Sequence, residues 1–159
     1  MKKIYTIGHS NLDFMRFLTL LQDNQISHII DIRSIPYSRH APWSNKSRLA
    51  EILKPFQIRY TYLGHKLGGK KPSQEKFNPS STESTRMAYQ NAIQAVHQRS
   101  ESETLALLCA ESDPANCHRQ HVIAQSLMKM GTRVIHILKN GETKDAWLED
   151  TLAEQPELF

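Results

Sequence analysis

The sequence contains little cysteine and no long apolar run. Two cysteines in 159 residues are too few for a disulfide framework, and they fit a reducing compartment. No apolar stretch approaches the roughly 20 residues that a membrane-spanning helix needs. The basic amino terminus also lacks an apolar stretch long enough for a secretory signal peptide. We therefore expect a cytoplasmic protein without a membrane partner.

The sequence also lacks internal repeats and low-complexity tracts, and 39% of its residues are hydrophobic. This composition excludes collagen-like and wholly disordered chains. A chain of this length buries roughly 70% of its unfolded surface and needs no metal or disulfide to hold it together. We expect residues 1–159 to form one domain without a cofactor.

Charge is distributed unevenly along the chain. The net charge is +4, yet residues 1–81 hold 13 basic and 5 acidic side chains, whereas residues 82–159 hold 7 basic and 11 acidic ones. A basic half of this kind predicts a face that attracts phosphate, nucleic acid or another anion. A scattered, solvated surface is the alternative interpretation.

Apolar runs alternate with helical patterns along the sequence. The runs predict five strands, at residues 3–7, 28–32, 58–63, 104–109 and 133–138. Helices are expected at residues 14–21, 47–53 and 89–96, after a loop at 110–116 and up to Gly131, and finally after Thr143 with Trp147, Leu148 and Leu152. We expect Ser10 or Asn11 to cap the first helix, with Asp13 in its first turn. Residues 64–84, which contain several glycines and prolines, predict a long loop.

This order of elements predicts an α/β fold with a mostly parallel sheet of about five strands and helices on both faces. The fold is Rossmann-like, but the single Gly8 after the first strand is not the three-glycine fingerprint of a dinucleotide-binding protein. In open α/β sheets, ligands bind outside the carboxyl ends of the strands. Polar residues that follow the strands are therefore the candidate site residues.

The strongest local motif is Cys-Ala-Glu-Ser-Asp-Pro-Ala-Asn-Cys-His-Arg at 109–119, which begins at a strand end and leads into a helix. Either the Asp-Pro pair or the Asn caps this helix and places Cys117, His118 and Arg119 near its first turn. Free N–H groups there bind anions and lower a thiol pKa, and the arginine adds a fork for phosphate. The motif predicts an anion pocket with a nucleophilic thiolate or a general acid. In the alternative, both cysteines are small buried hydrophobes, an interpretation we favour for Cys109.

Four short segments occur in order along nearly the whole chain: Thr-Ile-Gly-His-Ser at 6–10, Asp-Ile-Arg at 31–33 with Pro36, Ser38 and Arg39, Leu-Gly-Gly at 67–69, and Cys-Ala-Glu at 109–111 leading to Cys-His-Arg at 117–119. Together they resemble the bacterial and archaeal family known as domain of unknown function 488. The resemblance implies a small α/β protein with a polar cleft. It implies no established reaction.

Two other strand ends carry candidate groups. After the first strand, His9 is a candidate general base and Ser10 a candidate anion donor. Alternatively, Ser10 is a helix cap and His9 is merely exposed. After the second strand, Asp31 and Arg33 point to the same face, where Asp31 either orients a histidine or forms a structural ion pair with Arg33.

Two loops are rich in basic residues. Arg39 and His40 share a loop with Trp43, a combination that can hold a phosphate and stack a base. Residues 64–71 lack the P-loop pattern, because Pro72 stands where that motif needs serine or threonine, so nucleoside triphosphate hydrolysis is excluded. This segment is either a lid whose lysines meet phosphate or a solvated basic loop.

We expect an enzyme, a hydrolase or transferase, that acts on a phosphorylated or nucleotide-like small ligand at a polar cleft near the second cysteine. The alternatives are a nucleic-acid-binding or repair-associated module and a non-catalytic sensor of a small ligand. The candidate catalytic residues are His9, Asp31, Glu111, Cys117 and His118. The candidate substrate-binding residues are Ser10, Arg33, Arg39 and Arg119. The cysteines and histidines lack the paired spacing of a zinc site, so no metal is predicted, and the oligomeric state is left open.

Overall fold

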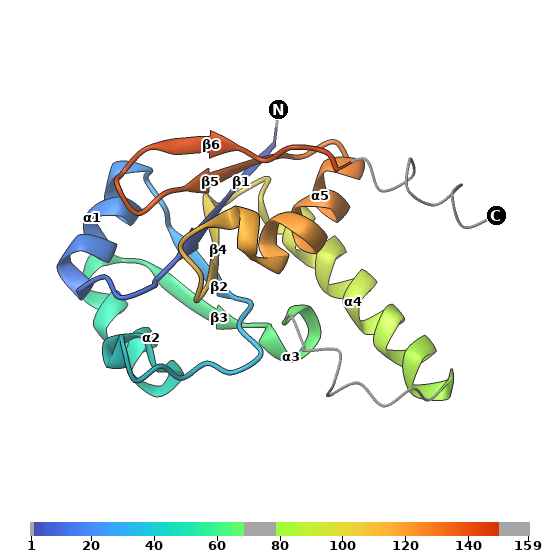
Figure 1. Cartoon of the computed structure of the whole chain (residues 1–159), viewed down its shortest axis with the longest axis horizontal. Coiled ribbons are helices and arrows are strands. Elements are labelled where there is room, and N and C mark those ends of the chain that lie inside the picture. The colour runs from blue at the N-terminus through green and yellow to red at the C-terminus, as the bar shows by residue number, and fades with distance from the viewer. Residues whose placement is uncertain (1, 69–78, 150–159) are drawn as a thin grey trace.

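A six-stranded sheet lies at the centre of the computed structural model, which describes residues 2–68 and 79–149 (Figure 1). The strands are β1 (Lys3–Gly8), β2 (His28–Asp31), β3 (Arg59–Tyr62), β4 (Leu105–Cys109), β5 (Arg133–Ile137) and β6 (Thr143–Asp145). Their order is β3-β2-β4-β1-β5-β6, with β1 to β5 parallel and β6 antiparallel to β5. The predicted mostly parallel, Rossmann-like α/β fold is confirmed.

Helices cover both faces of this sheet (Figure 1). On one face lie α1 (Phe14–Asp23) and α2 (Lys46–Leu53), and on the other lie α4 (Pro79–Arg99) and α5 (Gln125–Lys129). The short α3 (Gly64–Leu67) follows β3, and a π-helix (Arg119–Ala124) leads directly into α5. Short 3-10 turns lie at Pro42–Ser44, Lys54–Phe56 and Pro114–Asn116. None of the described helices combines the length and the apolar character that crossing a bilayer requires.

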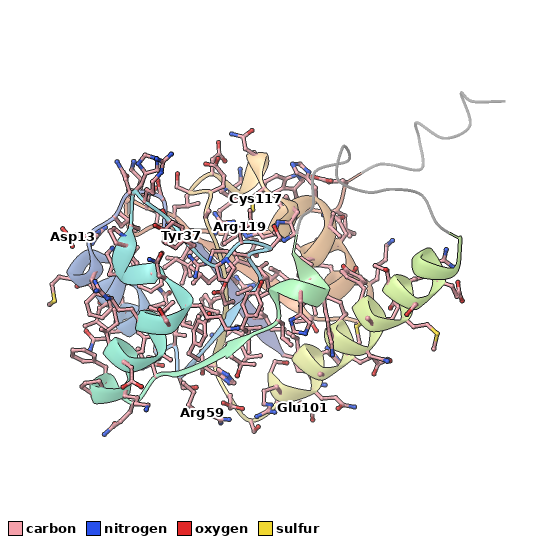
Figure 2. The ribbon with its side chains drawn as sticks, turned by 90° about the horizontal axis from the view of Figure 1, so that it is seen from below. Asp13, Tyr37, Arg59, Glu101, Cys117 and Arg119 are labelled. Carbon is pink, nitrogen blue, oxygen red and sulfur yellow. The ribbon has the colours of Figure 1, made fainter. Side chains whose placement is uncertain are left out.

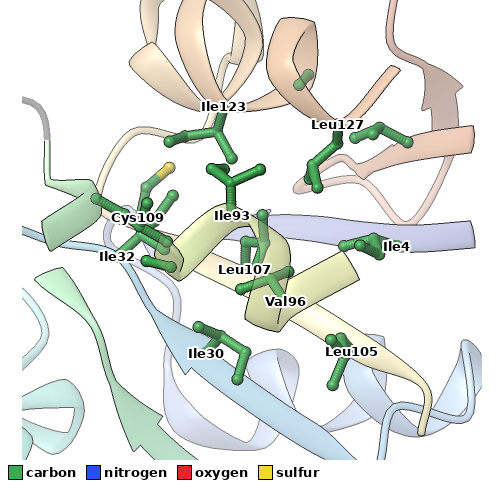
Figure 3. Close-up of a cluster of buried hydrophobic side chains, with 14 of the residues drawn as sticks. Ile4, Ile30, Ile32, Ile93, Val96, Leu105, Leu107, Cys109, Ile123 and Leu127 are labelled. Carbon is green, nitrogen blue, oxygen red and sulfur yellow. The ribbon is translucent and has the colours of Figure 1, made fainter. Parts of the chain in front are cut away.

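Strand alternation divides the core into two hydrophobic clusters. Successive side chains of a strand point to opposite faces of the sheet. In β4, Leu105, Leu107 and Cys109 belong to the cluster beneath α4 and α5 (Figure 3). Ala106 and Leu108 belong to the cluster beneath α1 and α2. The Cys109 side chain therefore lies on the α5 side of the sheet.

The chain leaves the neighbouring strands β1 and β4 toward opposite faces of the sheet. From β1 it runs through α1 to β2, and from β4 it runs through the π-helix and α5 to β5. Neighbouring strands whose connections diverge in this way form the topological switch point of a doubly wound sheet, where ligands bind. The carboxyl ends of β1 and β4 are therefore where the fold itself places a site.

The first helix has a different cap from the one predicted. Asp13 precedes α1, and its Oδ1 accepts a hydrogen bond of 2.8 Å from the Arg16 backbone N–H. Ser10 instead adopts a left-handed φ of 45°, and its backbone N–H donates to the Ala110 carbonyl oxygen at 2.8 Å. Because this backbone contact ties Ser10 to the loop after β4, the helix begins later, and the predicted cap at Ser10 or Asn11 is wrong.

Helical residues also replace part of the predicted loop at 64–84. Residues Gly64–Leu67 form α3, and α4 begins at Pro79. Proline is favoured in the first turn of a helix, where its missing N–H leaves no hydrogen bond unmade. Of the predicted lid's lysines, Lys66 is exposed on α3, whereas Lys70 and Lys71 fall within residues 69–78, which lie outside the described residues.

The predicted helix after Thr143 is wrong, because Thr143–Asp145 is the strand β6. Lys139, Asn140 and Gly141 form the loop of a hairpin, in which the Gly141 N–H donates to the Leu138 carbonyl oxygen at 2.9 Å and Gly141 has φ 96°, and β6 then pairs with β5. In a three-residue hairpin loop the last residue adopts positive φ, a conformation that glycine reaches without strain. Trp147 and Leu148 follow this strand without forming a helix, and Leu152 lies outside the described residues.

Candidate functional site

The backbone holds the carboxyl ends of β1 and β4 against each other. Gly8 lies opposite Cys109 in the sheet, and the next backbone N–H, that of His9, donates to the Cys109 carbonyl oxygen at 3.0 Å. A Cβ atom on Gly8 would lie 1.8 Å from the Glu111 carbonyl oxygen, so glycine is required for the loop after β4 to cross here. This close approach sends the loop back over the edge of the sheet, toward Cys117.

Two free cysteines meet at the end of β4. The Sγ atoms of Cys109 and Cys117 lie 3.1 Å apart, and the two residues are 2% and 7% exposed. The sequence interpretation of Cys109 as a buried hydrophobe accounts for its burial but not for this contact. Cys109 is thus a direct partner of the candidate nucleophile.

Cys117 itself caps the helix that follows it. Its backbone is extended, with φ −136° and ψ 144°, and its carbonyl oxygen accepts a hydrogen bond of 3.1 Å from the Gln120 N–H. Its Sγ lies 3.5 Å from the Arg119 backbone N–H, the position of a capping side chain. The Asp-Pro pair predicted as a helix start instead begins a short 3-10 turn, in which Asp113 Oδ1 accepts from the Ala115 N–H at 2.9 Å.

The two thiols have opposite pKa shifts. The hydrogen bond from Cys109 is the largest effect that lowers the pKa of Cys117, to about 4, and it outweighs burial. His118 and the Arg119 backbone N–H lower the same pKa further. Burial raises the pKa of Cys109 well above its usual range, and the hydrogen bond to Cys117 adds to this effect. The two shifts favour the thiolate form of Cys117 and the thiol form of Cys109, whose Sγ also donates to the Glu111 carbonyl oxygen at 3.4 Å.

The His118 ring lies between this thiolate and α3. Its Nε2 is 3.0 Å from the Leu67 carbonyl oxygen, and its Nδ1 is 3.7 Å from the Cys117 Sγ. Because a carbonyl oxygen accepts and never donates, Nε2 carries a proton and Nδ1 faces the sulfur. Cys117 and His118 are thus arranged as a nucleophile beside the base that takes its proton.

Arg119 is a buried cation without a carboxylate partner in the described part of the chain. It is 0% exposed, and its Nη2 donates to the Ser112 carbonyl oxygen at 2.8 Å. Its Nε and Nη1 have no hydrogen-bond partner among the described residues. No carboxylate of the described residues lies within ion-pair distance of the Arg119 guanidinium. Burying unpaired charge is costly, so these donors favour an anionic partner. Figure 2 shows Arg119 beside Cys117, and we call Cys109, Cys117, His118 and Arg119 the thiolate cluster.

His9 lies at the end of β1 and faces the α1 side. It is 3% exposed, its Nδ1 donates to the Ser10 carbonyl oxygen at 2.8 Å, and its Nε2 is buried without a partner among the described residues. Burial lowers the pKa of His9, so the ring is neutral at pH 7 and Nε2 has a free lone pair. The ring meets Trp43 edge-on, with centroids 6.2 Å apart. The alternative of an exposed His9 is therefore wrong.

Asp31 and Arg33 form a buried ion pair. Arg33 Nε and Nη2 donate to the two carboxylate oxygens at 2.9 and 2.7 Å. The Tyr60 hydroxyl donates to Asp31 at 2.6 Å, and Arg33 Nη2 also donates to the Ser44 carbonyl oxygen at 2.7 Å. Burial, followed by the hydrogen bond to Asp31, raises the pKa of Tyr60. These contacts engage the charged ends of both side chains, and they fix the loop between β2 and α2.

Three predicted residues lie nearer the surface. Arg39 is exposed in the loop before α2, and Glu111 is exposed with its Oε1 accepting from the Asp113 N–H at 3.1 Å. Ser10 is half-buried, and its hydroxyl donates to Asn11 Oδ1 at 3.4 Å. Within the described part of the chain, none of these three side chains is hydrogen-bonded to the thiolate cluster.

Two side chains near the site belong to the core. Trp43 is half-buried and packs against the aromatic rings of α1, and its Nε1 donates to the Leu12 carbonyl oxygen at 3.0 Å. His136 is fully buried and hydrogen-bonded to Thr6 Oγ1 at 2.6 Å and Gln120 Oε1 at 2.9 Å. Burial, followed by the charge of Arg119, lowers the pKa of His136 to about 4. His136 is therefore neutral and adds no positive charge beside the arginine.

The thiolate cluster is nearly closed to solvent. Two surface cavities of the described residues, about 510 and 380 Å³ in volume, lie elsewhere, lined mainly by residues 100–104 and by α5, β5 and β6. The cluster is reached through the half-buried His118 and the 7% exposed Cys117. Among the described residues, no group of three or more His, Cys, Asp or Glu side chains is arranged to hold a metal ion.

Fold and site together define a doubly wound α/β protein with a buried cysteine thiolate at its topological switch point. The chain belongs to the family described as "Domain of unknown function DUF488", whose model matches residues 13–126. This match confirms the resemblance predicted from the sequence motifs, and it contains the whole thiolate cluster, whereas Gly8 and His9 precede it. No curated protein and no solved structure matches the chain.

Proposed function

We propose that the protein is a hydrolase or transferase that moves a phosphoryl group through a covalent intermediate on Cys117. One observation carries the proposal: the fully buried Arg119, whose Nε and Nη1 have no hydrogen-bond partner among the described residues, follows two positions after a cysteine whose pKa is lowered to about 4. Covalent phosphoryl transfer needs these two groups, an ionised nucleophile and a cation for the phosphate oxygens. The substrate class is a phosphorylated or nucleotide-like small molecule.

The phosphate group is the proposed partner of the Arg119 guanidinium. Nε and one Nη of a guanidinium form a fork that matches two phosphate oxygens, and a phosphate supplies the negative charge that the buried cation favours. Backbone N–H groups at the start of the helix add to this attraction. The exposed Arg39 and the half-buried Ser10 are proposed to contact the rest of the substrate. Asp31 and Arg33 are proposed as positioning residues, because their ion pair fixes the loop that carries Arg39.

The chemistry takes two steps. Cys117 Sγ attacks the phosphorus atom, the bond from phosphorus to the leaving oxygen breaks, and that oxygen takes the proton carried by His118 Nδ1. In the second step the neutral His118 accepts a proton from water, or from an acceptor alcohol in a transferase, and the resulting oxygen nucleophile attacks the phosphorus. The sulfur–phosphorus bond breaks, its electron pair returns to sulfur, and the thiolate and the imidazolium are restored.

His9 and Glu111 are the further acid–base groups in this proposal. Neutral His9, with its free Nε2 lone pair, is a second base for the attacking water. Glu111, on the exposed loop after β4, is proposed to pass protons to solvent. Both roles are secondary, so their removal should lower turnover without preventing formation of the covalent intermediate.

The test compares Arg119→Lys with the matched control Arg133→Lys. Arg133 is half-exposed on β5 and pairs with Asp145, away from the thiolate cluster. Reduced protein is assayed with p-nitrophenyl phosphate and with a panel of nucleotides and sugar phosphates. Cys117→Ser should abolish turnover, Arg119→Lys should lower kcat/KM by roughly 100-fold or more, and Arg133→Lys should leave it unchanged.

Full turnover by Cys117→Ser would contradict the proposal. Phosphate that raises Tm without turnover of any substrate would support the non-catalytic sensor instead. Salt-dependent binding of an oligonucleotide without turnover would support the nucleic-acid-binding module.

A further inference from the structure

The contact between the two cysteines has a consequence that does not depend on phosphoryl transfer. Cys109 and Cys117 are the chain's two cysteines, and their Sγ atoms lie 3.1 Å apart. A disulfide bond is about 2.05 Å long, so side-chain movements of about 1 Å in total bring the sulfurs to bonding distance. Because the chain has no third cysteine, neither sulfur has a competing partner within the molecule.

We propose that Cys117 reduces a hydroperoxide and that Cys109 then resolves the oxidised sulfur as an intramolecular disulfide. The two positions differ in the way these roles require. Cys117 lies beside the half-buried His118 and is 7% exposed, whereas Cys109 is 2% exposed at the end of the central strand β4. A small oxidant therefore reaches Cys117 first.

The local electrostatics support the same order of events. A thiolate, and not a thiol, is the form that a peroxide oxidises. Cys117 is held as a thiolate by Cys109, His118 and the Arg119 backbone N–H. Cys109 stays protonated, because burial raises its pKa. It therefore does not react with the peroxide in the first step and is available to attack Cys117 in the second.

The reaction balances as follows. The Cys117 thiolate attacks one peroxide oxygen, the O–O bond breaks, and the departing oxygen takes a proton from solvent and leaves as water or an alcohol. Cys117 is now a sulfenic acid. Cys109 loses its proton and attacks this sulfur, the S–O bond breaks, and water leaves. In total, two thiols are oxidised to one disulfide and one hydroperoxide is reduced.

Oxidation would remove the Cys117 nucleophile from the site. The disulfide also removes the negative charge that the Arg119 N–H contacts in the reduced protein. Because both sulfurs end in one reversible bond, Cys117 is protected from oxidation to the sulfinic acid, which thiols do not reverse. A thiol reductant should restore the reduced state.

Intact-mass spectrometry tests the proposal. Reduced full-length protein is treated with one equivalent of hydrogen peroxide, denatured and alkylated with N-ethylmaleimide. The wild type should lose both alkylatable thiols and two hydrogen masses, and dithiothreitol should restore both. In Cys109→Ser the sulfenic acid on Cys117 should persist and be trapped by dimedone, and in Cys117→Ser the remaining Cys109 should stay reduced.

Three results would overturn the inference: two alkylatable thiols after peroxide treatment, equally fast oxidation of Cys109 in Cys117→Ser, or a main product that is a dimer linked between chains. Cys109→Ala provides a second resolving-thiol variant if the serine variant has a lowered Tm. Phosphoryl transfer is assayed separately, in dithiothreitol and without peroxide. A failure of the redox reaction is therefore distinguishable from a failure of the proposed function.

Discussion

Alkylation of Cys117 should follow a pH profile with a midpoint near pH 4, because its pKa is lowered to about 4. Only the thiolate reacts with iodoacetamide, so labelling should reach its plateau by about pH 6 and fall as the pH drops through the pKa. At pH 6 a thiol with this pKa is about 99% ionised, whereas an ordinary cysteine with a pKa near 8.5 is about 0.3% ionised. The difference in thiolate fraction is about 300-fold.

The Cys109 thiol is the largest cause of this shift, so removing it should move the midpoint. A hydrogen bond to a charged group contributes about 1.5–3 kcal/mol, and about 1.4 kcal/mol corresponds to one pH unit. A thiol is a weak donor, which favours the lower end of that range. Cys109→Ala should therefore raise the midpoint by about one pH unit, whereas Cys109→Ser, which keeps a donor, should raise it less.

Pulse labelling of folded, reduced protein between pH 3 and 9, followed by peptide mass spectrometry, measures both sites at once. Burial of the site slows labelling at every pH, so the midpoint and not the absolute rate is the test. Circular dichroism at each pH confirms that the protein stays folded. A midpoint near pH 8.5, or labelling of Cys109 before Cys117, would show that the pKa of Cys117 is not lowered in the folded protein.

Two further predictions concern buried charge. Arg119→Lys should abolish the Tm increase that inorganic phosphate gives the wild type, and should itself cost about 1–3 kcal/mol by removing a buried hydrogen bond; equal phosphate stabilisation of both proteins in a thermal-shift assay would show that Arg119 is not a ligand. Asp31→Asn should cost about 3–5 kcal/mol and lower Tm by roughly 10 °C, because it leaves Arg33 buried without its counter-charge. Asp145→Asn, which breaks an exposed ion pair, is the matched control and should leave Tm nearly unchanged. A similar Tm for both asparagine variants would show that burial of the pair has no energetic consequence.

The sequence predicts the buried strands well, and it places the candidate residues at their carboxyl ends. Isoleucine- and leucine-rich runs become the buried strands β2 and β4, because a parallel sheet covered on both faces needs apolar residues on both. The strand-end rule then selects the switch point, where Cys117, His118 and Arg119 indeed lie together. The sequence alone predicts that these three residues lie close together, because they are consecutive in the chain.

Contacts between distant residues are what the sequence does not reveal. The role of Cys109 depends on a loop that returns to the end of its own strand over Gly8, and no local pattern encodes that return. Arg33 pairs with Asp31 of β2, and the Tyr60 hydroxyl of β3 donates to the same carboxylate. This hydrogen bond joins residues 29 positions apart, so no local pattern predicts it. A local signal for β6 was present in the Asn-Gly turn at Asn140, but the apolar residues after it favoured a helix instead.

Covalent phosphoryl transfer to Cys117 is tested by rapid-quench mass spectrometry of the reduced protein mixed with p-nitrophenyl phosphate or acetyl phosphate. We expect one phosphoryl group on Cys117 before steady state, none in Cys117→Ser, a strongly reduced amount in Arg119→Lys, and an unchanged amount in Arg133→Lys. Phosphate release that proceeds unchanged in Cys117→Ser, with no phosphoryl adduct on the wild-type cysteine, would contradict it.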